Sequence, residues 1–396
     1  MTVSTTYELD REYVMQTYGR LPVTFVRGEG SYLFDENGNR YLDCLSGLAV
    51  TSLGHAHPEV ADAIAKQAKT LLHTSNLYLT EHQPVVAQAL DELIGGGGRT
   101  FFANSGAEAN ECAIKLARRY GQSNGGPHRF HIVSAYGSFH GRTLTTLAAT
   151  GQPQKQETFQ PLPEGFRQVE FCDIDALRDA LRDDRVCAVM LEPVQGEGGV
   201  IPAPPKYLQA VRALCDEREV LLIIDEVQTG LARTGKWFGF QHSGIRPDIV
   251  TMAKALGNGM PIGACWATDH VAQAFKPGDH ATTYGGQPLA TAAARCVLDI
   301  MRRDDVPSKA KRAGVLLRDQ LSALEQVDEV RGLGMLLAAQ LIDGIDAKVV
   351  AELCMEAGLI VNAVTATALR FAPSLLLSDV EIESAVSILS KVLEQQ

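Results

Sequence analysis

The sequence of 396 residues lacks the signatures of several protein classes. No apolar run approaches the roughly 20 residues that a membrane-spanning helix needs, so no transmembrane segment is predicted. No basic block is present and the formal net charge is -11, which makes nucleic acids and anionic membranes unexpected partners. The first residues, MTVSTTYELDREYV, contain no basic stretch followed by an apolar one, so a secretory signal is not expected.

Cysteine is present but follows no metal-binding or redox pattern. The eight cysteines include no CxxC pair, and scattered cysteines in a chain of this length indicate reduced thiols and a cytoplasmic location. His55 and His57 have no acid or third ligand at metal spacing, so we expect a structural role for them and no metal site. Residues 230–236 match the start of a P-loop, but Trp237 stands where that motif requires Ser or Thr, and a P-loop is rejected.

From residue 100 onward, short apolar segments alternate with amphipathic ones, a pattern typical of strands and helices that alternate along the chain. Strands are predicted over residues 100–103, 131–134, 186–191, 221–224, 249–252 and 263–267. Helices are predicted over residues 107–120, 175–183 and 205–218. This alternation predicts an α/β fold with a mostly parallel sheet flanked by helices.

The two ends of the chain follow a different pattern. Residues 31–50 alternate around Asn37 and Gly38, which predicts a hairpin, and helices are expected over residues 58–72 and 83–93. After Pro288, helices over residues 289–303 and 309–324 precede a glycine-rich strand region over 330–341, then a helix, a strand and a helix. We therefore expect a large domain over residues 61–287 and a smaller α+β domain over 288–396. An N-terminal segment over 1–60 should pack with the small domain, since a hairpin is not stable alone.

Two of the predicted strands end in charged residues. The run LLIID ends at Asp225, and the apolar run over residues 248–253 ends at Lys254, before a glycine-rich turn. Ligands of open α/β sheets bind at the carboxyl ends of strands, where both residues would lie. A carboxylate pairs with a pyridinium nitrogen and a lysine forms a Schiff base with an aldehyde, so this combination suits pyridoxal phosphate.

Further candidate residues occur in five other motifs. Ser105, Gly106 and Ala107 open a predicted helix, and the free backbone N–H groups of a helix start bind phosphate, although ordinary helix capping is the competing explanation. Loop motifs contribute Phe139 and Arg142 in SFHGRT, Glu192 and Glu197 in LEPVQGEGG, Thr282 and Thr283 in HATTYGGQP, and Arg370 in LRFAPSL. Taken one at a time, these residues also fit roles in the core, in turns or in salt bridges.

The order of the motifs along the chain is more specific than any one of them. SGAEANE, SFHGRT, LEPVQGEGG, DEVQTG, AKALGNGMPIGA, TTYGGQP, RGLGM and LRFAPSL follow one another in this order. The sequence thereby resembles, from about Tyr18 to Ile388, the class III, ornithine-type aminotransferases of fold type I, which depend on pyridoxal phosphate. Its opening TYGRLPVTFVRGEG and its LGHAHP segment resemble members of the family that act on N2-acetylornithine.

The resemblance implies a role for each candidate residue. Lys254 would carry the cofactor and act as the base, and Asp225 would pair with the pyridine nitrogen. The other cofactor-binding residues that it implies are Ser105, Gly106, Ala107, Phe139, Glu192, Val227, Gln228 and, across a homodimer interface, Thr283. The substrate-binding residues that it implies are Tyr18, Arg142 and Thr282 for the amino donor, and Arg370, screened by Glu197, for 2-oxoglutarate.

The reaction implied by the resemblance moves the terminal amino group of N2-acetylornithine to 2-oxoglutarate. Its products are N-acetylglutamate 5-semialdehyde and glutamate, which places it in arginine biosynthesis. Succinylornithine, ornithine, donors of the acetyl-lysine type and 4-aminobutyrate stay open. A mutase, racemase or decarboxylase on the same fold is the alternative class of enzyme. Two carboxylate-binding arginines, Arg142 and Arg370, favour transamination. A non-catalytic protein is disfavoured because Lys254, Asp225 and Gln228 are all present.

The sequence departs from the family pattern at three places. AKALGNG has Ala255 and Asn258 where glycines are usual, and LRFAPSL has Ser374 where a second proline is common. The segment VNAVTATA before Leu369 lacks the usual turn of glycine and proline. The first departure should leave the chemistry unchanged, whereas the other two bear on the position of Arg370.

Overall fold

A seven-stranded sheet forms the centre of the computed structural model, which describes residues 5–396. Its strands, in spatial order, are β4 (Gly98–Ala103), β12 (Gly263–Thr268), β11 (Ile249–Met252), β10 (Leu221–Asp225), β7 (Val186–Leu191), β5 (His131–Ala135) and β6 (Phe166–Val169). Strand β12 runs antiparallel to both of its neighbours, β11 and β4, and the strands from β11 to β6 pair in parallel. The predicted α/β fold with a mostly parallel sheet is confirmed.

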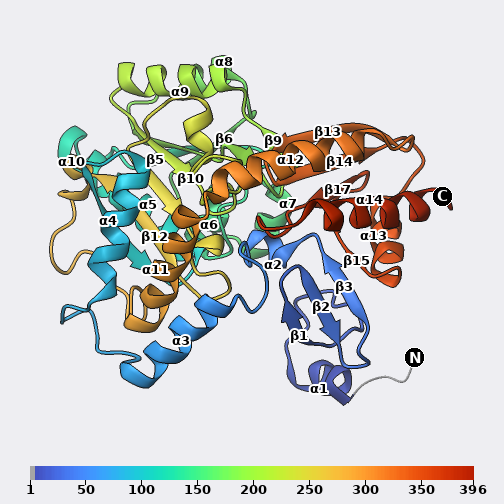
Figure 1. Cartoon of the computed structure of the whole chain (residues 1–396). Helices are drawn as coiled ribbons and strands as arrows, with labels where there is room; N and C mark the ends of the chain where they lie inside the picture. Colours follow the sequence, from blue (N-terminus) through green and yellow to red (C-terminus); the bar gives the residue numbers. More distant parts are fainter. Residues whose placement is uncertain (1–4) are drawn as a thin grey trace.

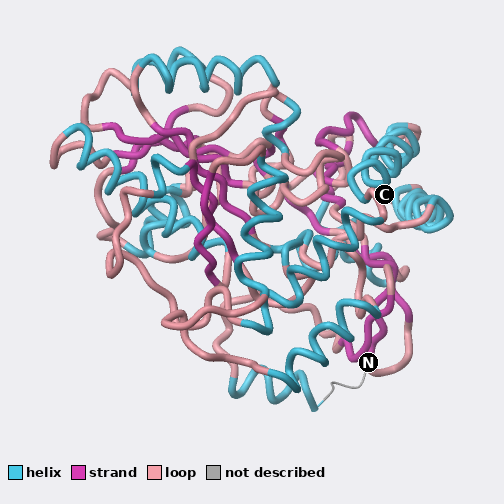
Figure 2. The backbone as a smooth tube through the Cα atoms, turned by 60° about the vertical axis from the view of Figure 1, so that its left-hand side comes forward, coloured by secondary structure: helices cyan, strands magenta, loops and turns pink. Residues whose placement is uncertain are grey.

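Alternate residues of the central strands face opposite layers of the core, because successive side chains of a strand point to opposite faces. In β10, Leu221 and Ile223 pack with residues of α5 (Gly106–Gly125), and Leu222 and Ile224 pack on the side of α9 (Pro205–Glu217). All five residues of β10 are buried, as expected of a strand covered on both faces. Figure 2 shows these strands running through the larger body with helices around them.

The C-terminal part of the chain builds a second sheet. Its strands, in spatial order, are β13 (Val327–Leu333), β14 (Leu336–Leu341), β17 (Ala368–Phe371) and β16 (Asn362–Thr365), and its helices are α12 (Val306–Ser322), α13 (Ala347–Glu356) and α14 (Asp379–Leu393). A capping box begins α14, since the Ser378 hydroxyl accepts from the Glu381 N–H and the Glu381 carboxylate accepts from the Ser378 N–H.

The N-terminal strands lie beside this second sheet rather than beside the first (Figure 1). They are β1 (Phe25–Glu29), β2 (Tyr32–Asp35) and β3 (Arg40–Asp43), and β3 pairs in parallel with β15 (Leu359–Ile360). Leu42 pairs with Leu359 in this register, so residues more than 300 positions apart share one small sheet. A hairpin that is marginal alone is stabilised by such an additional strand.

The remaining elements connect and cover these sheets. They are α1 (Thr5–Tyr13), α2 (Ser46–Ala49), α3 (Pro58–Thr70), α4 (His82–Ile94), α6 (Leu144–Ala149), α7 (Pro153–Gln156), β8 (Val194–Gln195), α8 (Ile174–Ala180), β9 (Ile201–Pro202), α10 (Asp269–Ala272) and α11 (Pro288–Arg303). The short elements β6, α6 and α7 were not predicted. A helix of fewer than two turns, or a strand of fewer than five residues, shows no clear hydrophobic periodicity in the sequence. Within residues 5–396, no helix is long and apolar enough to cross a membrane.

Candidate active site

A cavity of about 390 Å³ opens where β10 and β11 end. Residues from distant parts of the chain line it, and eleven of them are residues that the sequence indicated: Ser105, Gly106, Ala107, Phe139, Arg142, Glu192, Glu197, Asp225, Val227, Gln228 and Lys254. The topology explains this gathering, since strands that run in parallel end at the same edge of the sheet, and the loops after those ends meet there.

Asp225 and Lys254 follow neighbouring strands. Asp225 pairs with Thr251 across β10 and β11, and Lys254 comes three positions after Thr251, at the start of a single 3-10 turn. The backbone of Lys254 has a φ of 40°, in the left-handed region that side chains other than glycine rarely adopt. Burial lowers the pKa of the Lys254 ammonium to about 8, so a substantial fraction of this amine is neutral near pH 8.

Two buried side chains hold the Asp225 carboxylate. Its Oδ2 atom accepts a hydrogen bond from Nδ2 of Asn110 at 2.7 Å and lies 2.8 Å from Nδ1 of His140. Its Oδ1 atom accepts from the backbone N–H of Val227 at 3.0 Å. Burial lowers the pKa of His140, but the hydrogen bond and charge of Asp225 and the charge of Glu192 raise it above its ordinary value overall. The carboxylate is therefore fixed in position and surrounded by donors.

The start of α5 forms another wall of the cavity. Ser105 is the N-cap, and its hydroxyl accepts from the Glu108 N–H at 3.2 Å. A Cβ atom at Gly106 would lie 2.7 Å from Cγ1 of Val227, so only glycine lets the helix start approach the loop after β10 this closely. The free N–H groups of the first turn form a site for an anion such as a phosphate group.

Gln228 and Glu192 bring buried polar atoms to the same cavity. Both amide atoms of Gln228 are buried without a hydrogen-bond partner among residues 5–396. Buried polar groups are normally paired, so these atoms point to a polar ligand. Burial raises the pKa of Glu192 to about 7, and its carboxylate accepts from the backbone N–H of Phe139 at 3.0 Å.

Two arginines mark the ends of the site, and their surroundings differ. Arg142 is exposed and lies with its guanidinium 5.5 Å from the ring centre of Phe139. Arg370 is 1% exposed and its Nη1 atom lies 2.5 Å from Oε1 of Glu197. Burial raises the pKa of Glu197, but the charge and hydrogen bond of Arg370, with the charges of Lys254 and Lys155, lower it overall. Glu197 therefore stays ionised against Arg370.

The departures from the family pattern have local structural explanations. Residues 362–365 form β16, which pairs with β17, and the Asn362 Oδ1 atom accepts from Nε of Arg370 at 3.1 Å. The Ser374 hydroxyl donates to the backbone carbonyl of Ser52 at 3.3 Å. Asn258 has a φ of 47°, and its side chain accepts from the Leu53 N–H at 2.7 Å. Asn258 thus occupies a backbone conformation that favours glycine while adding a bond between distant segments.

Four predicted site residues do not line the first cavity in the single chain. Arg370 contacts it only through its ion pair with Glu197, and the other three lie outside it. Tyr18 is 71% exposed in the N-terminal region. Thr282 and Thr283 line a different cavity, of about 930 Å³, together with exposed residues of the 75–80 loop. Asn104, which lines the first cavity, donates from Nδ2 to the Thr282 hydroxyl at 3.3 Å, so the two regions adjoin. The roles expected for Tyr18, Thr282 and Thr283 stay predictions, as do the roles expected for the residues that line the first cavity.

Sequence reasoning missed three residues near the site. Asn110 is a polar residue on the apolar face of α5, a signal that could have revealed it. His140 stands inside the SFHGRT motif but received no role. Lys155 comes from α7, which was not predicted, and its ammonium lies 5.2 Å from the ring centre of Phe139.

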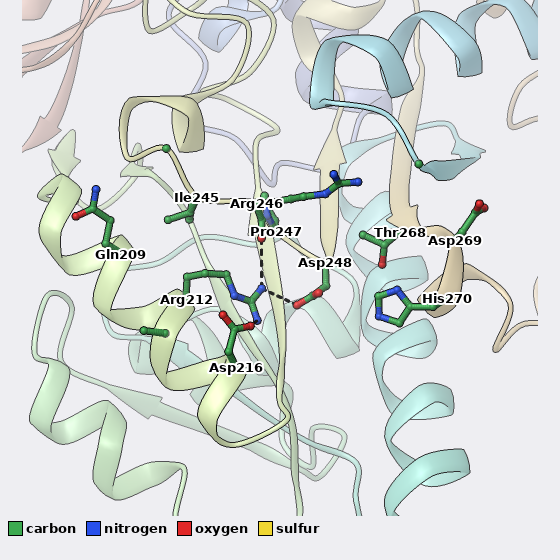
Figure 3. A pocket seen from close by; sticks show the side chains of 13 residues that line it. Gln209, Arg212, Asp216, Ile245, Arg246, Pro247, Asp248, Thr268, Asp269 and His270 are labelled. Carbon is green, nitrogen blue, oxygen red and sulfur yellow. Dashed lines mark hydrogen bonds and ion pairs between the residues drawn. The ribbon is translucent and has the colours of Figure 1, made fainter.

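A third cavity, of about 770 Å³, lies at the opposite edge of the sheet, at the starts of β10 and β11 (Figure 3). Arg212 forms ion pairs at 2.7 Å with both Asp216 and Asp248. Asp248 also accepts from the Leu222 N–H at 2.7 Å, which ties the ion pair to the first residues of β10. These ion pairs hold α9 to the sheet. None of the predicted site residues lines this cavity.

Comparison with known proteins agrees with this geometry. The profile of the family described as aminotransferase class-III matches residues 13–393. An acetylornithine aminotransferase of Caldanaerobacter subterraneus is 48% identical over 394 residues, which cover 98% of this chain and 99% of the relative. One from Methanocaldococcus jannaschii is 46% identical and covers 97% of each chain.

Solved structures of aminotransferases are also similar to this chain over nearly its whole length. The ornithine aminotransferase of Toxoplasma gondii has a TM-score of 0.94 at 34% identity and covers 98% of this chain and 94% of that one. The N-acetylornithine aminotransferase of Stenotrophomonas maltophilia has a TM-score of 0.85 at 35% identity, with 98% of each chain covered. With an acid and a lysine at adjoining strand ends and a match over nearly its whole length, this chain belongs to the class-III aminotransferase family.

Proposed function

We propose that the protein is a pyridoxal phosphate-dependent aminotransferase whose amino donor is N2-acetylornithine and whose acceptor is 2-oxoglutarate. The observation that carries this proposal is the cavity in which Lys254 and Asp225 lie together, with an open arginine, Arg142, and a screened one, Arg370, beside it. The similarity to acetylornithine aminotransferases at 45–48% identity over nearly the whole chain supports this choice of donor. The products are then N-acetylglutamate 5-semialdehyde and glutamate, as in arginine biosynthesis.

The residues of the cavity fit the cofactor. Its phosphate would be held by the start of α5 through Ser105, Gly106 and Ala107, and the unpaired amide of Gln228 is suited to its phenolic oxygen. Asp225 would pair with the pyridine nitrogen, and the Lys254 amine would bind the aldehyde carbon. Phe139 and Val227 would contact the ring, and Glu192 fixes the backbone of Phe139. When bound, pyridoxal phosphate supplies an electron-withdrawing ring next to the carbon that loses its proton.

The protein's own groups hold the substrate and move the proton. Arg142 has an exposed guanidinium and would bind the donor's carboxylate, far from the terminal amine that reacts. With its pKa lowered by burial to about 8, Lys254 has a neutral form that would accept the proton from the donor's amine-bearing carbon and deliver it to the former aldehyde carbon of the cofactor. Asp225, held by Asn110 and His140, would keep a negative charge behind the ring.

The paired state of Arg370 fits an enzyme that binds two different substrates in turn. While Glu197 is paired with Arg370, a donor carboxylate would find Arg142 as the available arginine. When 2-oxoglutarate enters, its α-carboxylate would take the place of Glu197 on Arg370. A mutase or decarboxylase would not need a second, switchable arginine of this kind, and this observation favours transamination over the alternative class of enzyme.

We further propose a homodimer in which Thr283 reaches the phosphate in the partner's site. Thr283 lines a cavity with Leu77 and Leu79, which are 85% and 100% exposed in the single chain. Tyr78 and Tyr284 are also exposed nearby in sequence. Large apolar residues gathered in this way are typical of a surface that a partner covers, and a second copy of the chain would also bring Thr282 toward the site.

We propose a reducing compartment, the cytoplasm, for this protein. All eight cysteines lie within the described residues and are free thiols, and six of them are buried. Buried free thiols are usual in reduced cytoplasmic proteins. We also propose the division of the chain into segments 1–60, 61–287 and 288–396. The pairing of β3 with β15 supports the placement of the N-terminal segment with the small domain.

The donor is tested by steady-state rates of the holoenzyme with acetylornithine, succinylornithine, ornithine and 4-aminobutyrate, each with 2-oxoglutarate. Acetylornithine should give the highest kcat/KM, and glutamate should form in equal amount to the aldehyde. If 4-aminobutyrate ranks above acetylornithine, the donor is wrong. If no donor bleaches the visible absorbance of the bound cofactor and 2-oxoglutarate does not restore it, the transamination itself is wrong.

A further inference from the structure

A second cation lies beside the donor arginine. The ammonium of Lys155 lies 5.2 Å from the ring centre of Phe139, and the guanidinium of Arg142 lies 5.5 Å from the same ring centre. Phe139 and Arg142 both line the cavity that holds Lys254. Lys155 is half-buried, and among residues 5–396 its ammonium has no carboxylate in an ion pair. Two cations that form no ion pair within the described part of the chain thus meet at one aromatic side chain.

The position of Lys155 is fixed by the backbone around it. Lys155 belongs to α7, a single turn that starts at Pro153. The Gln152 side chain donates to the Ser138 carbonyl at 3.1 Å, and the Gln156 side chain donates to the Thr150 carbonyl at 2.7 Å. A Cβ atom at Gly151 would lie 2.0 Å from the Ala135 carbonyl oxygen, so glycine is required for this close approach. The turn is therefore tied to the loop that carries Phe139.

The charges around Lys155 place it in the electrostatic field of the site. Burial and the charge of Arg142 lower the pKa of Lys155, and the charge of Glu197 opposes this shift. Lys155 in turn contributes to the low pKa of Glu197, after Arg370 and Lys254. Lys155 does not itself line the cavity, but its ammonium lies against the ring of Phe139, a cavity residue that Arg142 also contacts.

We propose that Lys155 is a donor-specificity residue that binds the acyl group of an Nα-acylated diamino acid while Arg142 binds its α-carboxylate. This inference rests on the proposed function and deepens it. An amide carbonyl oxygen accepts a hydrogen bond from an ammonium, and a dicarboxylic acyl group such as succinyl also offers a carboxylate. A free α-ammonium, as in ornithine, would be repelled by the same cation. Lys155 thus favours acylated donors and disfavours the free diamino acid.

The test compares the holoenzyme with the variants Lys155→Met and Lys155→Arg. The methionine has similar length without the charge, and the arginine keeps the charge. Lys348→Met is the matched control, because Lys348 is an exposed lysine of α13 in the small domain. For each protein, kcat/KM is measured with acetylornithine, succinylornithine, ornithine and 4-aminobutyrate, and the single-turnover rate with glutamate is measured separately.

The expected result is a change in selectivity rather than a general loss. Lys155→Met should lower kcat/KM for acetylornithine by about tenfold, the usual effect of one lost charged hydrogen bond. Succinylornithine should lose more, because it loses an ion pair as well. Ornithine should be unchanged or improved, and the rates with 4-aminobutyrate and glutamate should stay near those of the wild type. Lys155→Arg should restore most of the selectivity.

Two outcomes would overturn the inference. In the first, Lys155→Met leaves the ratio of acetylornithine to ornithine unchanged. In the second, it lowers the rates with all donors and with glutamate equally, as a distorted Phe139 loop would. Both are separate from a failure of the proposed function, which is read from the wild-type donor panel alone. A wild-type enzyme that rejects every acylated donor would refute the donor assignment and, with it, this role of Lys155.

Discussion

Oδ2 of Asp225 lies 2.8 Å from Nδ1 of His140, and the two residues are 4% and 2% exposed. The other ring nitrogen of His140, Nε2, is buried without a partner among the described residues. The backbone carbonyl of His140 also accepts from Asn110, which donates to Asp225 as well. The three side chains form one buried network behind the proposed cofactor position, and this network holds the Asp225 carboxylate in place.

Removal of the His140 donor should impair catalysis without unfolding the protein. For His140→Leu we expect kcat to fall roughly ten- to hundredfold, since a hydrogen bond to a buried carboxylate is lost. His140→Asn, whose Nδ2 atom can still donate, should retain more activity. The measurements are kcat and the pH dependence of the visible spectrum of the bound cofactor. Equal losses in the two variants would contradict a role for the hydrogen bond.

Glu197 should control which carboxylates reach Arg370. In Glu197→Gln the arginine loses its anionic partner, so glutamate should bind more readily relative to acetylornithine. We expect the ratio of the single-turnover rate with glutamate to that with acetylornithine to rise about tenfold. Glu329→Gln is the control, because Glu329 is an exposed partner of Arg331 at 3.6 Å. An unchanged ratio would mean that Glu197 does not screen Arg370.

The rate of cofactor binding should report the lowered pKa of Lys254. The neutral amine is the form that attacks the aldehyde. Its fraction rises steeply with pH below the pKa of about 8 and approaches its maximum above it. For the apoenzyme we expect the rate of colour formation with added pyridoxal phosphate to rise about tenfold per pH unit below pH 8 and then to level off. A rate that continues to rise past pH 9 would indicate an ordinary lysine, whose pKa is about 10.4.

Arg233 should be important for stability. It is fully buried and donates to the carbonyls of Met335 and Pro373 and to the Ser52 hydroxyl, so it joins three distant segments. Arg233→Met leaves two buried carbonyls unpaired and should lower the free energy of unfolding by about 3 kcal/mol.

The effect of Arg233→Met is measured as a shift of the urea midpoint at constant slope. Arg312→Met, on the exposed surface of α12, should change the free energy of unfolding by less than about 0.5 kcal/mol. A similar small effect of Arg233→Met would contradict its role as a link between segments.

The proposed homodimer predicts that a charge at Leu79 weakens self-association. Leu79 is 100% exposed in the single chain, so Leu79→Asp should not disturb its folding, but it would bury a carboxylate in the dimer. We expect a shift from dimer to monomer in analytical ultracentrifugation, with loss of activity if Thr283 acts across the interface. Val380→Asp, at a 74% exposed position of α14, should remain dimeric. Unchanged association of Leu79→Asp would place the interface elsewhere.

The sequence by itself determined the class of fold and the positions of the main reactive groups. Apolar runs such as LLIID and IVTM specify buried strands locally, and the residues that follow them, including Asp225 and Lys254, lie at the strand ends for the same local reason. The prediction of a parallel sheet then brought both residues to one edge. The antiparallel direction of β12 was not predicted, because an apolar run carries no information about strand direction.

Only the tertiary structure decided which distant residues act together. The pairing of Arg370 with Glu197 joins positions 173 residues apart, and the contact of Lys155 with Phe139 depends on a one-turn helix without periodicity. The exposure of Thr283 in the single chain likewise depends on how its loop is placed. The physical reason is that hydrophobic periodicity and turn residues determine the backbone conformation of only a few neighbouring positions. Contacts between strands and domains follow from strand order and packing, which no short window of sequence contains.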